Sequence, residues 1–152
     1  MKNDNLLVKS WTSCPHELAD IRQNVKAVCT RLRFTEKDTN EIVLAIDEAC
    51  TNIIRYAYKD CRDGTIRLEI VKNNQQVIFR LHDHAKHVSQ DCLEQKNNDP
   101  LKPGGLGVML MQQVMNSVKF VHTSQCKGNI LDVGCGIGLT IQYATEKGLE
   151  AY

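Results

Sequence analysis

Glu48 and Asn52 are the residues whose types and spacing point most directly to chemistry. They lie four positions apart in a segment with helical apolar spacing, so a helix would place both side chains on one face, one turn apart. A carboxylate can act as a general base toward a hydroxyl group or water, and an amide oxygen suits the hard Mg²⁺ ion. The alternative is that Glu48 and Asn52 are an ordinary solvated pair on an amphipathic helix. Taken without other signals, the two residues favour this alternative.

Two further signals follow along the chain. Asp83 ends a predicted strand, where a carboxylate that faces a pocket can accept a hydrogen bond from an exocyclic amine such as that of adenine. The alternative for Asp83 is an ordinary turn residue. Gly105-Leu106-Gly107 opens a predicted helix, and glycines there let the free backbone amides of a helix N-terminus approach phosphate. The alternative is a flexible hinge, because a lone Gly-x-Gly is weak evidence.

The elements that must position these residues follow from hydrophobic spacing. Ser13 and Pro15 mark the start of a first helix, and Thr35 with Asp38 forms a variant capping box at the start of a second. The spacing predicts a strand at 6–11, helices at about 18–34 and 35–57, a hairpin of strands at 66–70 and 77–81, a helix at 108–118, and strands at 118–122 and 128–133. Strands grouped apart from helices indicate an α+β two-layer sandwich, with helices on one face of a mainly antiparallel mixed sheet.

The polar segment at 83–103 carries two prolines and no sustained periodicity, which is typical of a functional loop. We interpret residues 88–103 as a lid over the phosphates of a ligand.

The bulk composition narrows the class of protein. The chain has 152 residues with a net charge of +1 and 5% aromatic residues, which gives no case for binding nucleic acid or an anionic membrane. No apolar run approaches the roughly 20 residues of a membrane span, and the first residues do not read as a signal peptide. The seven cysteines show no metal-knuckle spacing. We therefore expect a cytoplasmic protein with reduced thiols.

The order of the three signals resembles that of the GHKL ATPases. Residues 44–58, with Glu48 and Asn52, are similar to the asparagine box of the anti-sigma-factor serine kinase branch, and residues 105–116 are similar to its second glycine box. The resemblance covers roughly residues 6–131. It implies the Bergerat ATP-binding fold, ATP and Mg²⁺ as ligands, a homodimer, a sequestered sigma factor, and phosphorylation of a serine on a STAS-type anti-anti-sigma partner.

The resemblance also implies roles for individual residues. It makes Glu48 the catalytic base, Asn52 the Mg²⁺ ligand and Asp83 the residue that holds the adenine amine. It also places Ala85 beside the adenine ring, and Gly105, Leu106 and Gly107 along the phosphates. The first glycine box departs from the family pattern, because Asp83-His84-Ala85-Lys86-His87 has lost both glycines, and His87 is bulky enough to obstruct a nucleotide. A second hypothesis is therefore a partner-binding switch module of the same fold with weak or no kinase activity. His82 and His84 share a strand face, but a metal site there lacks a further ligand.

The C-terminal segment carries a second resemblance. Residues 130–138 are similar to the first motif of S-adenosylmethionine-dependent methyltransferases. Only residues 139–152 follow, which is too short for the remaining βα units, so we expect no complete methyltransferase. We predict a domain at 1–134 and a tail at 135–152, where residues 140–147 form a helix or mark a junction with unrelated sequence.

Overall fold

The computed structural model is a two-layer α+β sandwich, described for residues 3–58, 63–73, 76–83, 105–123, 128–135, 143–145 and 148–150. Its elements are β1 (Asn3–Thr12), the 3₁₀ turn η1 (Pro15–Glu17), α1 (Leu18–Arg31), α2 (Glu36–Asn52), the π-helical turn η2 (Ile53–Ala57), β2 (Thr65–Asn73), β3 (Gln76–Asp83), α4 (Gly105–Val114), β4 (Ser117–Thr123), β5 (Gly128–Cys135), β6 (Tyr143–Thr145) and β7 (Gly148–Glu150). No helix of the described residues is long and apolar enough to cross a membrane.

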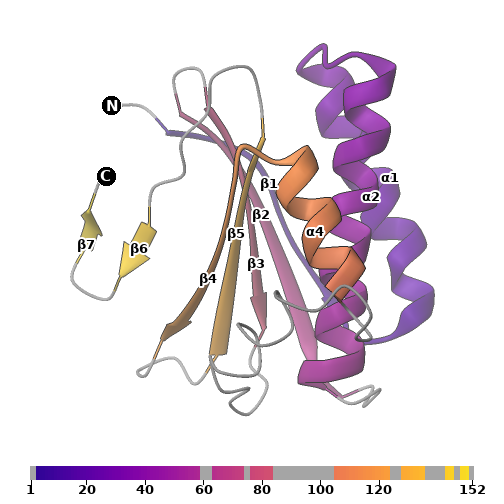
Figure 1. The fold of residues 1–152 in the computed structure, drawn as a ribbon, viewed down its shortest axis with the longest axis vertical. Helices are drawn as coiled ribbons and strands as arrows, with labels where there is room; N and C mark the ends of the chain where they lie inside the picture. Colours follow the sequence, from indigo (N-terminus) through magenta and orange to yellow (C-terminus); the bar gives the residue numbers. More distant parts are fainter. Residues whose placement is uncertain are drawn as a thin grey trace.

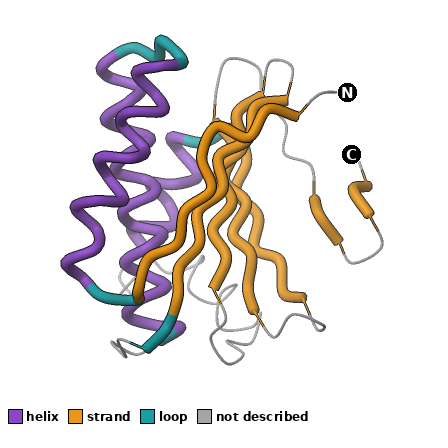
Figure 2. Tube along the Cα trace, turned by 180° about the vertical axis from the view of Figure 1, so that it is seen from behind, coloured by secondary structure: helices purple, strands orange, loops and turns teal. Residues whose placement is uncertain are grey.

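A five-stranded sheet forms one layer, and α1, α2 and α4 lie together on one of its faces (Figures 1 and 2). The strand order is β1-β2-β3-β5-β4. All four pairings are antiparallel, so the described strands lack the parallel pairing that a mixed sheet would include. The predicted hairpin is confirmed, since Asn73 pairs with Gln76 and Ile66 pairs with Asp83.

The core lies between the helices and the sheet, as the alternating pattern predicts. Ile66, Leu68 and Ile70 of β2 are fully buried, and so are Phe79 and Leu81 of β3. The buried helix residues that meet them are Ile21, Val25, Ile42, Ala45, Ile46, Ala49, Cys50, Met111 and Met115. Cys50 acts as a small apolar residue, and burial raises the pKa of its thiol. Cys14, Cys29 and Cys50 are free thiols.

Two helix starts behave differently from each other. Thr35 caps α2 as predicted, because its Oγ1 accepts a hydrogen bond from the Asp38 backbone N–H at 3.1 Å. Ser13 does not cap the first helix, which begins with η1 after Cys14. The Ser13 hydroxyl oxygen instead accepts a hydrogen bond from the Gly64 N–H at 3.0 Å. The Ser13 hydroxyl therefore bonds to the distant Gly64 and not to a backbone N–H of the helix that follows it, as the sequence suggested.

The second half of the chain corrects two predictions. The helix expected at 108–118 runs from Gly105 to Val114, so the glycines form its first turn and Val118 belongs to β4. The tail helix expected at 140–147 is wrong for 143–145, because Tyr143–Thr145 is a strand that pairs with Gly148–Glu150. Residues 130–135 of the methyltransferase-like motif lie in β5, antiparallel to both neighbours. His84, Ala85, His87 and the expected lid lie outside the described residues.

Candidate functional site

Glu48, Asn52 and Gly107 meet where α4 begins against the last turns of α2. Both polar side chains are half-buried. A Cβ atom placed on Gly107 would lie 2.7 Å from Oε2 of Glu48 and 3.5 Å from Nδ2 of Asn52. A side chain at position 107 would displace the Glu48 carboxylate, so glycine allows the α4 backbone to approach the carboxylate and the amide.

The packing of α4 explains why Gly107 faces α2. Met111 and Met115 follow Gly107 at intervals of four residues and are 0% and 3% exposed. Residues four apart share a helix face, so the face that begins with Gly107 continues into the core. The side chain of Leu106 points away from this face and is 70% exposed. Leu106 therefore leaves only its backbone at the helix start, as does Gly105, the first residue of α4.

Asp83 approaches the same end of the molecule from the sheet layer. It is the last residue of β3 and is only 4% exposed. It alternates with Phe79 and Leu81, so its side chain is on the face that the helices cover. In Figure 1 the end of β3, the end of α2 and the start of α4 all lie at the lower end of the fold. The three atoms nearest to the Cβ position of Gly107 belong to Glu48 and Asn52.

His82, by the same alternation, is on the face of the sheet opposite Asp83 and the helices. Its Nε2 lies 3.5 Å from Oε2 of Glu69, which also pairs with Arg67 at 2.7 Å. Burial lowers the pKa of His82, and the Glu69 carboxylate opposes that shift. Among the described residues, no group of three or more His, Cys, Asp or Glu residues could hold a metal ion.

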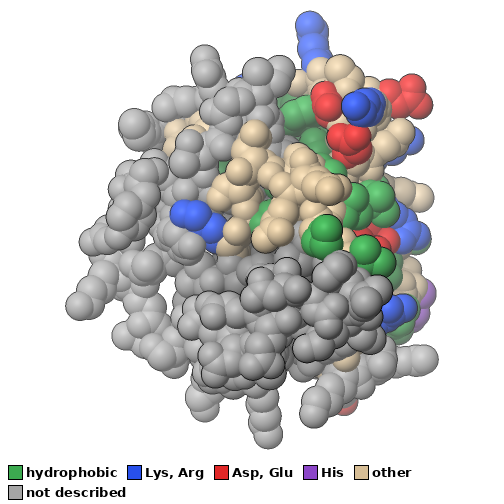
Figure 3. All heavy atoms as spheres, viewed as in Figure 1, with side chains coloured by type: hydrophobic (Ala, Val, Ile, Leu, Met, Phe, Trp, Pro, Cys, Tyr) green, Lys and Arg blue, Asp and Glu red, His purple; other side chains and the backbone are tan. Residues whose placement is uncertain are grey.

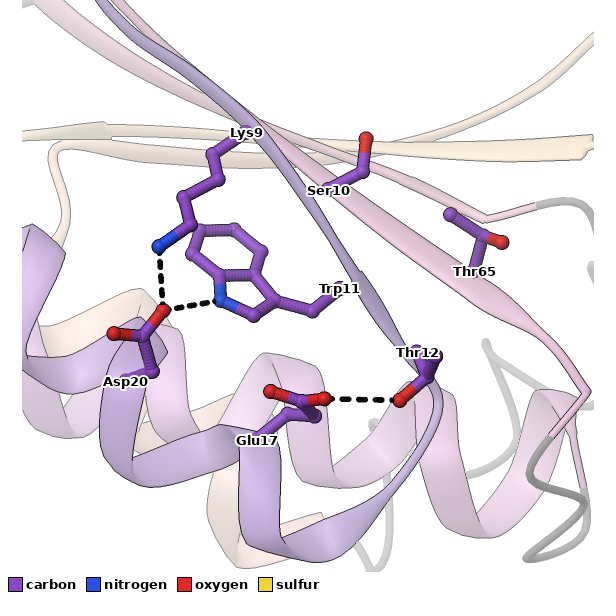
Figure 4. A pocket seen from close by; sticks show the side chains of 7 residues that line it. All are labelled: Lys9, Ser10, Trp11, Thr12, Glu17, Asp20 and Thr65. Atoms are coloured by element: carbon purple, nitrogen blue, oxygen red, sulfur yellow. Dashed lines mark hydrogen bonds and ion pairs between the residues drawn. The ribbon is translucent and has the colours of Figure 1, made fainter.

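A shallow groove of about 490 Å³ lies elsewhere, between β1 and the start of α1. Lys9, Trp11, Glu17 and Asp20 line it, together with Ser10, Thr12 and Thr65 (Figure 4). Its charged side chains are paired within the groove, because the Asp20 carboxylate accepts hydrogen bonds from Lys9 and Trp11, and Glu17 accepts one from Thr12. This groove contains none of the residues that the sequence analysis selected for chemistry.

The outer surface of the helix layer carries several exposed hydrophobic side chains. Leu44 of α2 is 46% exposed, and Met109 of α4 is 39% exposed. In Figure 3 hydrophobic side chains are visible over the region where α4 lies against α2, between charged groups at the edge of the molecule. Leu44 precedes Glu48 by one helical turn, so part of this apolar surface continues toward the Glu48 and Asn52 pair.

The turn after Asn52 involves residues that the sequence analysis missed. The Tyr58 N–H donates to the Ile53 carbonyl at 3.0 Å, which closes the π-helical turn η2. The Tyr58 hydroxyl donates to the Thr65 carbonyl at 2.8 Å and accepts from the Thr65 N–H at 3.3 Å. The sequence offered Tyr58 only as the last residue of the asparagine box.

Comparison with known proteins identifies the class of protein first. The chain matches the histidine kinase-like ATPase domain over residues 12–134, which is most of its length. Two solved structures share its fold. The RsbU and RsbW domains of Rv1364c from Mycobacterium tuberculosis superpose with a TM-score of 0.62 at 13% identity, over 90% of this chain and 32% of that chain. The SiaB-SiaC complex from Pseudomonas aeruginosa gives a TM-score of 0.59 at 10% identity, over 88% of this chain and 91% of that chain.

Curated relatives narrow the class further. Serine-protein kinase RsbW of Bacillus licheniformis is 30% identical over 114 residues, which are 69% of this chain and 71% of the relative. Serine-protein kinase RsbW of Bacillus subtilis (strain 168) is 29% identical over 120 residues, which are 72% of this chain and 74% of the relative. This chain belongs to the histidine kinase-like ATPase family, in its serine-protein kinase branch, as the two sequence boxes indicate.

Proposed function

We propose that this chain binds ATP with Mg²⁺ and phosphorylates a serine of a STAS-type anti-anti-sigma protein in a partner-switching system. The observation that carries the proposal is the contact of Gly107, in the first turn of α4, with Glu48 and Asn52. It unites a candidate base, a candidate metal ligand and a helix N-terminus, the three components that phosphoryl transfer needs in one place.

The chemistry of these groups fits the proposed ligands. A carboxylate and an amide supply the oxygen atoms that Mg²⁺ prefers, and the first backbone amides of α4 favour phosphate. Because Gly107 has no side chain, the α4 backbone lies close to the Glu48 carboxylate and the Asn52 amide. When bound, Mg²⁺ neutralises part of the negative charge on the phosphates.

Each residue then has a defined role in the proposal. Glu48 orients the acceptor hydroxyl and takes its proton as the oxygen–phosphorus bond forms and ADP leaves. Asn52 contributes its amide oxygen to the metal. The buried Asp83 carboxylate accepts a hydrogen bond from the adenine amine. In this proposal the phosphates bind along the backbone of Gly105, Leu106 and Gly107. Ala85 is assigned to the adenine ring of the nucleotide. Residues 1–134 form the domain with this activity, and residues 135–152 are a tail that follows it.

The partner assignment rests on the relatives. The matched curated proteins are serine-protein kinases, and one structural neighbour is part of a complex with a second protein, SiaC. We propose a cytoplasmic homodimer that alternates between a STAS-type partner and a sigma factor.

Nucleotide binding and single-turnover phosphorylation test this function. ATP binding is measured by calorimetry for the wild type and for Asp83→Asn, which loses binding. Phosphoryl transfer to a STAS-type protein from the same organism is measured for Glu48→Ala, which retains ATP binding but transfers roughly 10²- to 10⁴-fold more slowly. Normal transfer by Glu48→Ala would remove Glu48 from the mechanism.

The altered first glycine box favours a second candidate function. Asp83-His84-Ala85-Lys86-His87 lacks both glycines, and a chain with an obstructed pocket would still bind its protein partner. Undetectable ATP binding at millimolar nucleotide, with partner binding intact in a pull-down between purified proteins, would replace the kinase with this partner-binding module.

A further inference from the structure

We infer that Tyr58 is a positioning residue for the proposed magnesium ligand Asn52, and this inference rests on the proposed function. Asn52 is the last residue of α2, and only the π-helical turn η2 separates it from Tyr58. The Tyr58 N–H closes that turn on the Ile53 carbonyl. Single π-helical turns within α-helices occur frequently at functional sites.

The Tyr58 hydroxyl fixes the turn to the sheet. It exchanges two hydrogen bonds with the backbone of Thr65, the first residue of β2. Thr65 precedes Ile66, which pairs directly with Asp83 in the sheet. A single phenol therefore connects the turn after the proposed metal ligand to the strand position beside the proposed adenine ligand.

Gly64 allows this connection because it has no side chain. A Cβ atom on Gly64 would collide with the Tyr58 ring. Gly64 cannot retreat easily, because its N–H donates to Ser13 Oγ at 3.0 Å and its carbonyl accepts from the Ser13 N–H at 2.9 Å. The ring of Tyr58 is thus confined on one side by a glycine backbone that Ser13, directly after β1, holds in place.

The consequence is a separation of two functions in one site. Displacement of the η2 turn moves Asn52 at its start, whereas Asp83 keeps its place through the pairing of β2 with β3. Loss of the phenol hydroxyl therefore weakens the part of nucleotide binding that depends on Mg²⁺ and leaves the part that depends on adenine. A defect that merely loosened the fold would weaken both parts together.

Tyr58→Phe tests this inference, because it keeps the ring and removes both hydrogen bonds to Thr65. A fluorescent ATP analogue is titrated in EDTA and over a series of Mg²⁺ concentrations. We expect unchanged binding in EDTA and a roughly tenfold increase in the Mg²⁺ concentration for half-maximal binding, the usual effect of losing a group that orients a metal ligand. Thr12→Val is the matched control, because it removes an exposed hydroxyl opposite Thr65 on β1 and matches the wild type.

The double variant Tyr58→Phe with Asn52→Ala decides whether Tyr58 acts through Asn52. Once Asn52 is absent, removal of the phenol hydroxyl has no further effect on the Mg²⁺ dependence. A Mg²⁺ dependence equal to the wild type in Tyr58→Phe, equal losses with and without Mg²⁺, or a second loss on top of Asn52→Ala would each overturn the inference while the kinase assignment stands. Absence of nucleotide binding by the wild type would instead overturn the proposed function, and the role of Tyr58 with it.

Discussion

Gly64 and Gly107 stand at the two sides of one short stretch of α2 and its following turn, and both touch side chains that carry the proposals. A side chain at Gly107 would meet Glu48 and Asn52, which are polar and half-buried. A side chain at Gly64 would meet the ring of Tyr58, and Gly64 itself is buried and bonded to Ser13. The first contact concerns the direction of the proposed catalytic carboxylate of Glu48, and the second concerns whether the η2 turn can close.

Substitution of the two glycines should therefore have different effects on the same site. A half-buried carboxylate such as Glu48 can turn toward solvent, so crowding at position 107 moves the side chain and leaves the fold intact. The Tyr58 ring is confined by Gly64, so crowding there must be absorbed by the turn or by β1. We expect activity to respond mainly to Gly107 and stability mainly to Gly64.

Gly107→Ala is the largest expected effect on activity. The new methyl group displaces the Glu48 carboxylate, and a misplacement of about 1 Å in a catalytic group can slow a reaction by roughly 10²-fold. Helix propensity favours alanine over glycine by about 1 kcal/mol, so the fold remains stable. Single-turnover phosphorylation and thermal unfolding measure the two effects, with the partly exposed Met109→Ala on the same helix as control. Full activity in Gly107→Ala would remove the contrast between the two glycines.

Gly64→Ala is the larger of the two expected effects on stability. Insertion of a methyl group into a closely packed position costs about 1–3 kcal/mol, and we expect a value in the upper half of that range because Ser13 prevents retreat of the backbone. Urea unfolding measures the change in the free energy of unfolding. Lys72→Ala, exposed on the same strand β2, is the control. A free energy of unfolding equal to that of the wild type would mean that the Tyr58 ring is free to move.

The sequence predicted the features that local chemistry decides. The Thr35 cap involves two residues three positions apart, and the alternation of β2 and β3 locates their buried faces. Alternation from Phe79 to Asp83 also indicates that the Asp83 side chain lies on the same face of the sheet as Phe79. The motif spacing selected Glu48, Asn52 and Gly107, which the fold brings together.

The features that the sequence left open depend on distant partners. The Gly64 N–H and the Ser13 hydroxyl are 51 positions apart, so Ser13 followed by Pro15 resembled an ordinary helix start. Residues up to 57 follow a continuous helical pattern, which does not show that the helix widens into a π turn closed by the Tyr58 N–H or that the Tyr58 hydroxyl bonds to Thr65. The insertion of β5 between β3 and β4 is likewise a long-range choice that hydrophobic alternation does not encode.

Ser13→Ala sharpens the comparison because it loosens Gly64 without crowding it. The variant leaves the buried Gly64 N–H without its acceptor, and an unsatisfied buried donor costs about 1–3 kcal/mol. We expect the lower half of this range, because the Ser13 N–H still donates to the Gly64 carbonyl. Urea unfolding of Ser13→Ala and of the double variant with Gly64→Ala measures the coupling. If Ser13 confines Gly64, alanine at position 64 is tolerated better once the serine hydroxyl is gone.

Asp20→Asn has the smallest expected effect on stability. It compares the closely packed turn η2 beside Gly64 with the open groove of Figure 4, which contains Asp20. Hydrogen bonds from Lys9 and then from Trp11 lower the pKa of Asp20 below its usual value. The folded pKa lies below the unfolded one, so the carboxylate stabilises the fold above the unfolded pKa. This contribution disappears as the pH falls through the folded pKa.

The Asp20→Asn variant should therefore show a shallower loss of stability below about pH 4 than the wild type, with little change at neutral pH, because the pair is exposed to solvent. Trp11 is the single tryptophan of the chain, so its fluorescence reports urea unfolding from within this groove. An unchanged pH dependence in the variant would mean that the bonds to Lys9 and Trp11 contribute nothing in solution. Burial of Trp11 would then be the contribution of this region to stability, just as close packing against the Tyr58 ring is the contribution of Gly64.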